Sequence, residues 1–170
     1  MERSPQTLSV AVVASDQLRQ RCHAILAGTR GDGVQSRGVG FADAPGLLRR
    51  YRPSVLLLDA VASPLQALGV LPSLRRLSPT TGVILLSRNR TPTAVLLEGL
   101  RRGAWGYLTE RDLPRHLPKA VCAVADGEPW ISRRLSAAIV AELRAIRQAA
   151  NGRQRTRLRL IRGGRTSTPR

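Results

Sequence analysis

The polar residues that could do chemistry stand where apolar runs of the sequence end. Asp59 closes one such run, Ser87 closes another, and Glu110 follows a third. A carboxylate can act as a nucleophile or bind a divalent ion, and a hydroxyl can hydrogen-bond to developing negative charge. The candidate chemistry is therefore that of carboxylates and hydroxyls brought together by the elements that precede them.

Other kinds of site have little support. Cys22 and Cys122 lie far apart and form no metal or redox motif. His23 and His116 stand alone in the sequence, and we expect both to be solvated. No glycine-rich loop follows the first apolar run, which argues against nucleotide binding. We therefore predict no resident cofactor, no metal site and no enzymatic activity.

Short apolar runs alternate with stretches of helical spacing, a pattern typical of βαβ units. The expected strands are 8–13, 34–39, 55–59, 83–87 and 105–109, and the expected helices are 16–27, 43–51, 65–77, 93–102 and 112–125. Strands that are apolar throughout are buried on both faces, which predicts an α/β fold with a doubly wound parallel sheet. Such sheets gather functional groups beyond the carboxyl ends of their strands. Those ends hold Ala14, Ser15, Asp16, Asp59, Ser87, Thr109 and Glu110.

The C-terminal part divides differently. We predict a receiver-like domain over 7–128, a C-terminal linker helix over 129–148 and a basic, disordered tail over 149–170. Leu158, Leu160 and Ile161 leave a short helix or strand open within the tail. Ser132 is a suitable N-cap for a helix from Arg133 to Arg147. The tail contains a cluster of arginines that could bind nucleic acid: Arg153, Arg155, Arg157, Arg159 and Arg162.

The composition sets further bounds. The chain has 170 residues, 42% of them hydrophobic, which is enough to bury the core of one domain. Its net charge is +17, and 27 of the 28 basic residues are arginine. Residues 151–170 hold seven arginines and no acid, so residues 1–150 still carry +17 − 7 = +10. No apolar run is long enough to span a membrane and no signal-peptide core follows Met1, so we expect a cytoplasmic protein.

Three segments carry a family resemblance: Pro53-Ser-Val-Leu-Leu-Leu-Asp59, Trp105-Gly-Tyr-Leu-Thr-Glu110 and Gly127-Glu-Pro-Trp-Ile-Ser132. With them, residues 8–130 resemble a bacterial response-regulator receiver domain of the NarL/FixJ type in order and spacing. The resemblance implies a flavodoxin-like five-stranded sheet in the order 2-1-3-4-5, followed by a C-terminal helix. It also implies a role in two-component phosphorelay signalling and in transcription regulation.

The family's chemistry is transfer of a phosphoryl group from a histidine kinase to an aspartate, assisted by Mg²⁺. The resemblance places Asp59 at the phosphoacceptor position and Ser87 at the hydroxyl position of the switch. Tyr107 falls on the aromatic position that rotates in signalling. Partners are expected to be a protein or a second copy of the chain, bound through the fourth helix, fifth strand and fifth helix. That surface would include Arg101, Arg102, Tyr107, Arg115 and Lys119.

This sequence departs from the family's pattern around the acceptor. Ala14 and Ser15 stand where the family has its metal-holding acids, Asp16 is one residue further on, and Glu110 replaces a lysine. We therefore expect an atypical receiver in which phosphorylation of Asp59 is weak or lost. The alternative is a phosphorylatable receiver that binds Mg²⁺ through Asp16 and Glu110.

No helix-turn-helix pattern follows Arg147, where the family continues into its output domain. The arginine tail has three interpretations: a non-specific, salt-dependent nucleic-acid contact, a solvated segment that reflects codon bias, or the remnant of a lost output domain. The sequence does not choose among them, and it names neither the input signal nor the regulated process.

Overall fold

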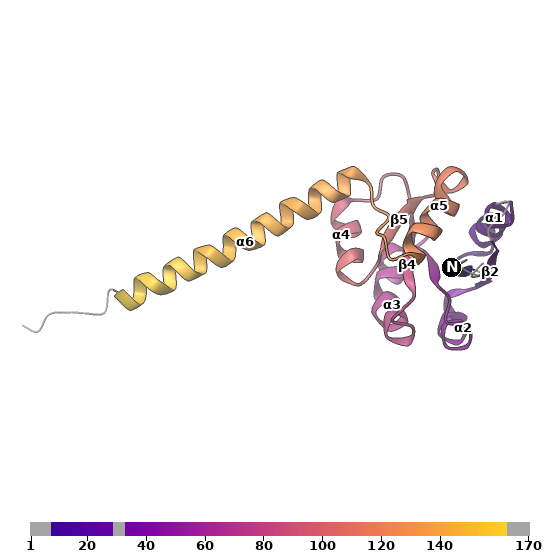
Figure 1. Cartoon of the computed structure of the whole chain (residues 1–170), viewed down its shortest axis with the longest axis horizontal. Helices are drawn as coiled ribbons and strands as arrows, with labels where there is room; N and C mark the ends of the chain where they lie inside the picture. Colours follow the sequence, from indigo (N-terminus) through magenta and orange to yellow (C-terminus); the bar gives the residue numbers. More distant parts are fainter. Residues whose placement is uncertain (1–7, 29–32, 163–170) are drawn as a thin grey trace, which may run out of the picture. The chain divides into compact units, whose positions relative to one another are not determined.

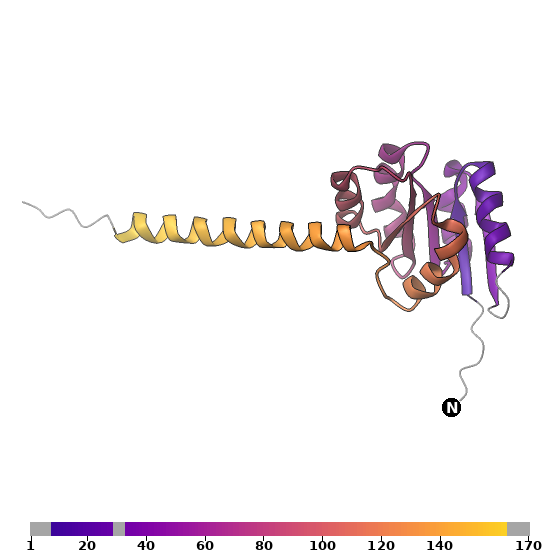
Figure 2. The same cartoon turned by 90° about the horizontal axis from the view of Figure 1, so that it is seen from above.

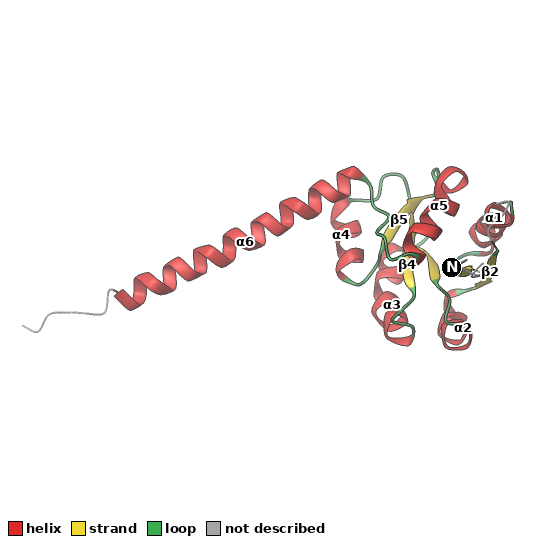
Figure 3. Cartoon of the chain, viewed as in Figure 1, coloured by secondary structure: helices red, strands yellow, loops and turns green. Residues whose placement is uncertain are grey.

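A computed structural model describes the backbone of residues 8–28 and 33–162, and side chains up to residue 150. The chain divides into two compact units, Met1–Ser132 and Arg133–Arg170. In the first unit a five-stranded sheet alternates with helices (Figure 1, Figure 3). Its strands are β1 (Leu8–Val13), β2 (Val34–Val39), β3 (Val55–Asp59), β4 (Gly82–Ser87) and β5 (Gly106–Thr109). Its helices are α1 (Asp16–Ala27), the short 3₁₀ helix η1 (Phe41–Asp43), α2 (Ala44–Tyr51), α3 (Pro64–Leu77), α4 (Thr93–Arg101) and α5 (Leu113–Ala125).

The strands are parallel and lie in the order β2-β1-β3-β4-β5, which confirms the predicted flavodoxin-like topology. Every residue of β3 and β4 is buried, because helices cover both faces of the sheet. Alternate side chains of each central strand therefore enter different cores. Leu57 packs with α1 and α5 on one face, whereas Leu56 and Leu58 pack with α2 and α3 on the other. This arrangement fixes where the strand ends meet.

The outer edge of β5 is covered by the segment that leads out of the sheet. Trp130 forms a parallel bridge with Gly106, and its carbonyl oxygen accepts a hydrogen bond from the N–H of Tyr107 at 2.9 Å. The N–H of Trp130 in turn donates to the carbonyl of Trp105 at 3.0 Å. A Cβ on Gly106 would lie 2.8 Å from the carbonyl oxygen of Trp130, so glycine allows this close approach.

The described part of the second unit forms one continuous helix, α6 (Arg133–Arg162) (Figure 2). The prediction that this helix ends at Arg147 is wrong, and the segment 149–162 of the predicted disordered tail is helical. Gly152 is the one helix-breaking residue type in that segment, and its neighbours are largely Ala, Gln, Arg and Leu, which favour helix. The last eight residues of the predicted tail lie outside the described residues.

Candidate functional site

Asp59 is the last residue of β3, and its carboxylate is held by backbone N–H groups. Oδ1 accepts from Val61 at 2.8 Å and from Ala62 at 3.4 Å, and Oδ2 accepts from Ser15 at 3.2 Å. The residue is only 2% exposed. An ionised carboxylate offers about four lone-pair sites, so three of them are directed at the protein's own backbone. Asp59 is thus a buried strand-end carboxylate that is hydrogen-bonded to nearby backbone.

The end of β1 brings no acidic side chain to this carboxylate. Ala14 is buried, and Ser15 contributes its backbone N–H. Asp16 begins α1, is 84% exposed at its side chain and forms an ion pair with Arg19 in the same helical turn. The offset of one residue thus places the acid on the helix surface, where it stabilises the first turn.

The ends of β4 and β5 lie next to each other. Ser87 is buried and pairs in register with Thr109, and the N–H of Glu110 donates to the carbonyl of Ser87 at 3.1 Å. The Thr109 hydroxyl donates to Oδ2 of Asp112 at 2.6 Å, just before α5. Glu110 is half-buried. The carboxyl ends of β3, β4 and β5 therefore bring Asp59, Ser87 and Glu110 to the same end of the sheet, as predicted from the strand pattern.

These residues do not fit a magnesium site. Mg²⁺ is held by oxygen ligands in near-octahedral geometry, including one or two carboxylates. Within 8–28 and 33–150, no three His, Cys, Asp or Glu side chains gather where they could hold a metal ion. Asp16 forms an ion pair with Arg19, and both oxygens of Asp59 accept hydrogen bonds from backbone N–H groups.

A cavity of about 460 Å³ opens beside the β4 and β5 ends, on the side of α5. Its lining is formed by Asn89, Thr109, Arg111, Asp112, Arg115 and His116. Asp59 is not among these residues, so the opening presents arginines instead of the acceptor-position carboxylate. Sequence reasoning missed this cavity, because it depends on two loops that only the fold brings together.

Both histidines are less solvated than we expected from the sequence. His23 is half-buried, and its Nδ1 lies 2.6 Å from the Ser36 hydroxyl. His116 is half-buried as well, with its ring centroid 6.1 Å from that of Trp130. Burial lowers the pKa of His23, and the nearby Arg19 guanidinium lowers it further.

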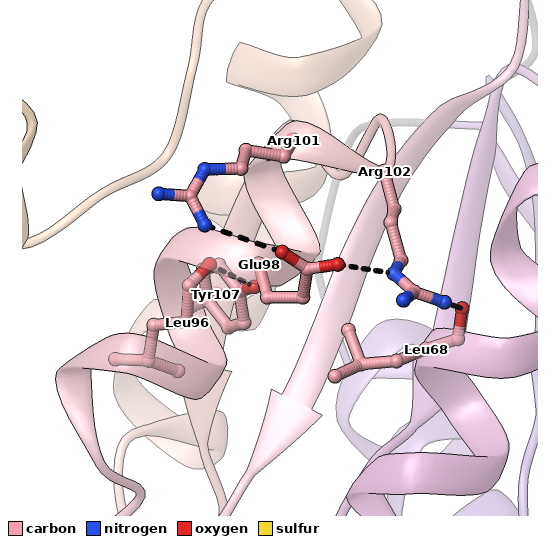
Figure 4. A network of polar contacts seen from close by, with 6 residues as sticks. All are labelled: Leu68, Leu96, Glu98, Arg101, Arg102 and Tyr107. Atoms are coloured by element: carbon pink, nitrogen blue, oxygen red, sulfur yellow. Dashed lines mark hydrogen bonds and ion pairs between the residues drawn. The ribbon is translucent and has the colours of Figure 1, made fainter. Parts of the chain in front are cut away.

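Tyr107 is held with its ring against α4 (Figure 4). Its hydroxyl donates to the carbonyl oxygen of Leu96 at 2.5 Å. Burial raises the pKa of Tyr107, and the carboxylate of Glu98 raises it further. A Cβ on Gly99 would overlap the Tyr107 hydroxyl and lie 2.8 Å from Cδ1 of Leu85, so α4 has a glycine where the ring rests. This contact had no signal in the sequence.

The arginines at the end of α4 converge on one carboxylate (Figure 4). Glu98 accepts from Nε of Arg102 at 2.7 Å and from Arg101 at 3.3 Å. Hydrogen bonds from Arg102 and then Arg101 hold the pKa of Glu98 below its usual range. Arg102 also donates to the carbonyl of Leu68 at 3.0 Å, which ties α4 to α3. Both arginines remain exposed, as are Arg115 and Lys119 on α5, whereas Tyr107 is half-buried.

The five arginines of the predicted nucleic-acid contact, between residues 153 and 162, belong to the last part of α6. Only the backbone of this part is described. Within the described part of the chain, no helix is long and apolar enough to cross a membrane.

Comparisons with known proteins agree with the fold. No family model matches the sequence. The signal receiver domain of NarL from Mycobacterium tuberculosis is 26% identical, with a TM-score of 0.63 over 73% of this chain and 100% of that one. A LuxR family DNA-binding response regulator from Silicibacter pomeroyi is 25% identical, with a TM-score of 0.63 over 75% of this chain and 98% of that one. The receiver domain of RcsB from Salmonella enterica serovar Typhimurium is 21% identical, with a TM-score of 0.65 over 78% of this chain and 98% of that one.

A curated relative adds a weaker sequence match. An uncharacterised transcriptional regulatory protein of Bacillus subtilis, YxjL, is 30% identical over 100 residues. The match covers 59% of this chain and spans 45% of the length of that relative. The chain thus has the receiver fold of response regulators, and its sequence is similar to those of NarL- and LuxR-type members.

Proposed function

We propose that this chain is an atypical receiver that acts in signal transduction, and through it in transcription regulation, by protein–protein contact. Phosphorylation of Asp59 is weak or lost. The observation that carries the proposal is the set of three backbone N–H groups bonded to the Asp59 carboxylate, at 2.8, 3.2 and 3.4 Å. A nucleophile needs an accessible lone pair. Because Asp59 is buried and its oxygens accept these hydrogen bonds, a phosphodonor has little access to the carboxylate.

Charge at the strand ends supports the same conclusion. Transferring a phosphoryl group creates negative charge that a cation must balance. Glu110 stands where the resemblance implies a lysine, a local difference of about two charges. For unit charges about 4 Å apart in an effective dielectric of about 20, the interaction energy is about 4 kcal/mol. Glu110 follows β5 and Asp59 ends β3, so Glu110 opposes a phosphoryl group on Asp59 across the end of the intervening strand β4.

The output would then depend on binding. A receiver that no longer responds to phosphate can still shift between two conformations when a partner binds one of them better. The exposed residues of α4 and α5, with β5 between them, form the surface that we assign to a protein partner or to a second copy of the chain. A histidine kinase remains the expected partner if Asp59 does accept phosphate.

Intact mass measurement after incubation with acetyl phosphate and Mg²⁺ tests the proposal. We expect no gain of a phosphoryl mass in the wild-type chain beyond that in Asp59→Asn. A wild-type gain that is lost in Asp59→Asn would establish the alternative, a phosphorylatable receiver. A receiver with the acidic pair, such as that of a NarL-type regulator, serves as the positive control.

A second candidate function is nucleic-acid binding by the C-terminal arginines. Its support is that α6 continues to Arg162, so five arginines without an acidic neighbour follow Ala150 on one helix. Phosphate contacts make binding fall steeply with salt. A salt titration with duplex DNA, comparing the full chain with a chain ended at Ala150, separates the two functions. Equal binding and equal salt slopes in both chains would exclude the arginines as a contact.

A further inference from the structure

An apolar stripe follows one face of α6 and lies largely in solvent. Leu143 is 60% exposed and Ile146 is 59% exposed, and Ile139 and Ala150 continue the same line. The steps between these four residues are four, three and four, the spacing of a coiled-coil seam. Helices with one apolar face owe most of their stability to packing of that face. A partner that packs against the stripe would therefore stabilise α6.

Charge identifies that partner. When Ile139 and Ile146 are placed at heptad position d and Leu143 at position a, Glu142 falls at g and Arg147 at the following e. In a parallel coiled coil, g of one helix faces the following e of its neighbour. Glu142 of one copy then meets Arg147 of the other, and the symmetric pair forms as well. An antiparallel pair would bring like positions together, and Glu142 would face Glu142.

From this geometry we infer that α6 mediates parallel self-association with further copies of this chain, through the Ile139–Leu143–Ile146–Ala150 seam. The inference is independent of whether Asp59 accepts phosphate, and it involves a surface other than α4, β5 and α5. Leu at a with Ile at d favours bundles of three or four helices over pairs. The stoichiometry is therefore read from the measured mass, whereas the direction of pairing follows from the charges.

Sedimentation equilibrium of the full chain over a concentration series provides the first test. We expect an oligomer for the wild type, and Leu143→Glu should weaken association by about tenfold or more, because it buries a charge in the seam. Ala141→Glu is the matched control, since Ala141 lies at position f on the opposite face. A monomeric wild type, or equal masses for the two variants, would overturn the inference.

A charge exchange tests the direction of pairing without relying on a disruptive variant. Glu142→Arg alone and Arg147→Glu alone each place like charges across the seam, and each should weaken self-association. An equimolar mixture of these two variants should recover association at least in part, because each g–e contact between unlike copies again joins opposite charges. Oligomers that persist unchanged in both single variants, or a mixture no stronger than its components, would refute the parallel seam.

Discussion

The backbone N–H of Ser15 donates to Oδ2 of Asp59 across 3.2 Å and so joins the end of β1 to the end of β3. The other oxygen of the same carboxylate binds the N–H groups of Val61 and Ala62, in the loop that leads to α3. Asp59 thus connects three stretches of chain from a buried position. Its hydrogen bonds hold the end of β1, the end of β3 and the loop before α3 together.

This role predicts a large cost for removing the side chain. Asp59→Ala leaves three backbone donors with no acceptor, and we expect the free energy of unfolding to fall by about 2–4 kcal/mol. Asp16→Ala removes an exposed acid that pairs with Arg19, and it should change the stability by no more than about 0.5–1 kcal/mol. Urea unfolding followed by circular dichroism measures both. Similar values for the two variants would show that the Asp59 contacts contribute little.

Substituting alanine for glycine should change the free energy of unfolding in opposite directions at Gly99, which contacts Tyr107, and at Gly69, which has open space around it. Gly99→Ala forces the ring away from Leu96, and we expect a loss of about 1–3 kcal/mol. Gly69→Ala in α3 meets no atom within 4 Å, so it should stabilise the protein by about 0.5–1 kcal/mol. In a Tyr107→Phe background the penalty of Gly99→Ala should shrink. An unchanged penalty would mean that the hydroxyl is not what the glycine accommodates.

Cys22 should be an unreactive thiol. It is fully buried, and burial raises its pKa to about 11, with a smaller opposing effect from Arg21. The thiolate is the reactive form, so Cys22 should react slowly with a thiol reagent. In a Cys122→Ser variant at pH 8, we expect the folded chain to react at least about 100-fold more slowly than the chain unfolded in urea. A folded rate close to the unfolded rate would show that the α1 face opens readily to solvent.

The environment of His23 predicts how stability changes with pH. Its pKa is lowered in the folded chain, so the unfolded chain binds a proton at higher pH. The free energy of unfolding should therefore fall as the pH drops from about 7 to about 5, through the ordinary range of histidine. His23→Gln should flatten this slope. Identical slopes in the variant and the wild type would assign the pH dependence to other groups.

The topology could be predicted because short apolar runs of the sequence are enough to specify it. The apolar runs before Asp59 and Ser87 specify buried parallel strands, and the strand ends then gather as the fold requires. The end of α6 could not be fixed, because the residues after Arg147 have helix propensity without an apolar period. The ring of Tyr107 on Gly99 depends on a side-chain rotamer and on the approach of α4, which sequence spacing does not encode.

The most direct measurement is a crystal structure of the chain grown with beryllofluoride and Mg²⁺, a mimic of the phosphorylated aspartate. Our proposal predicts that Asp59 keeps its bonds to the N–H groups of Ser15, Val61 and Ala62, with neither adduct nor metal beside it. Electron density for beryllofluoride on the Asp59 carboxylate, bridged to a bound Mg²⁺, would contradict it.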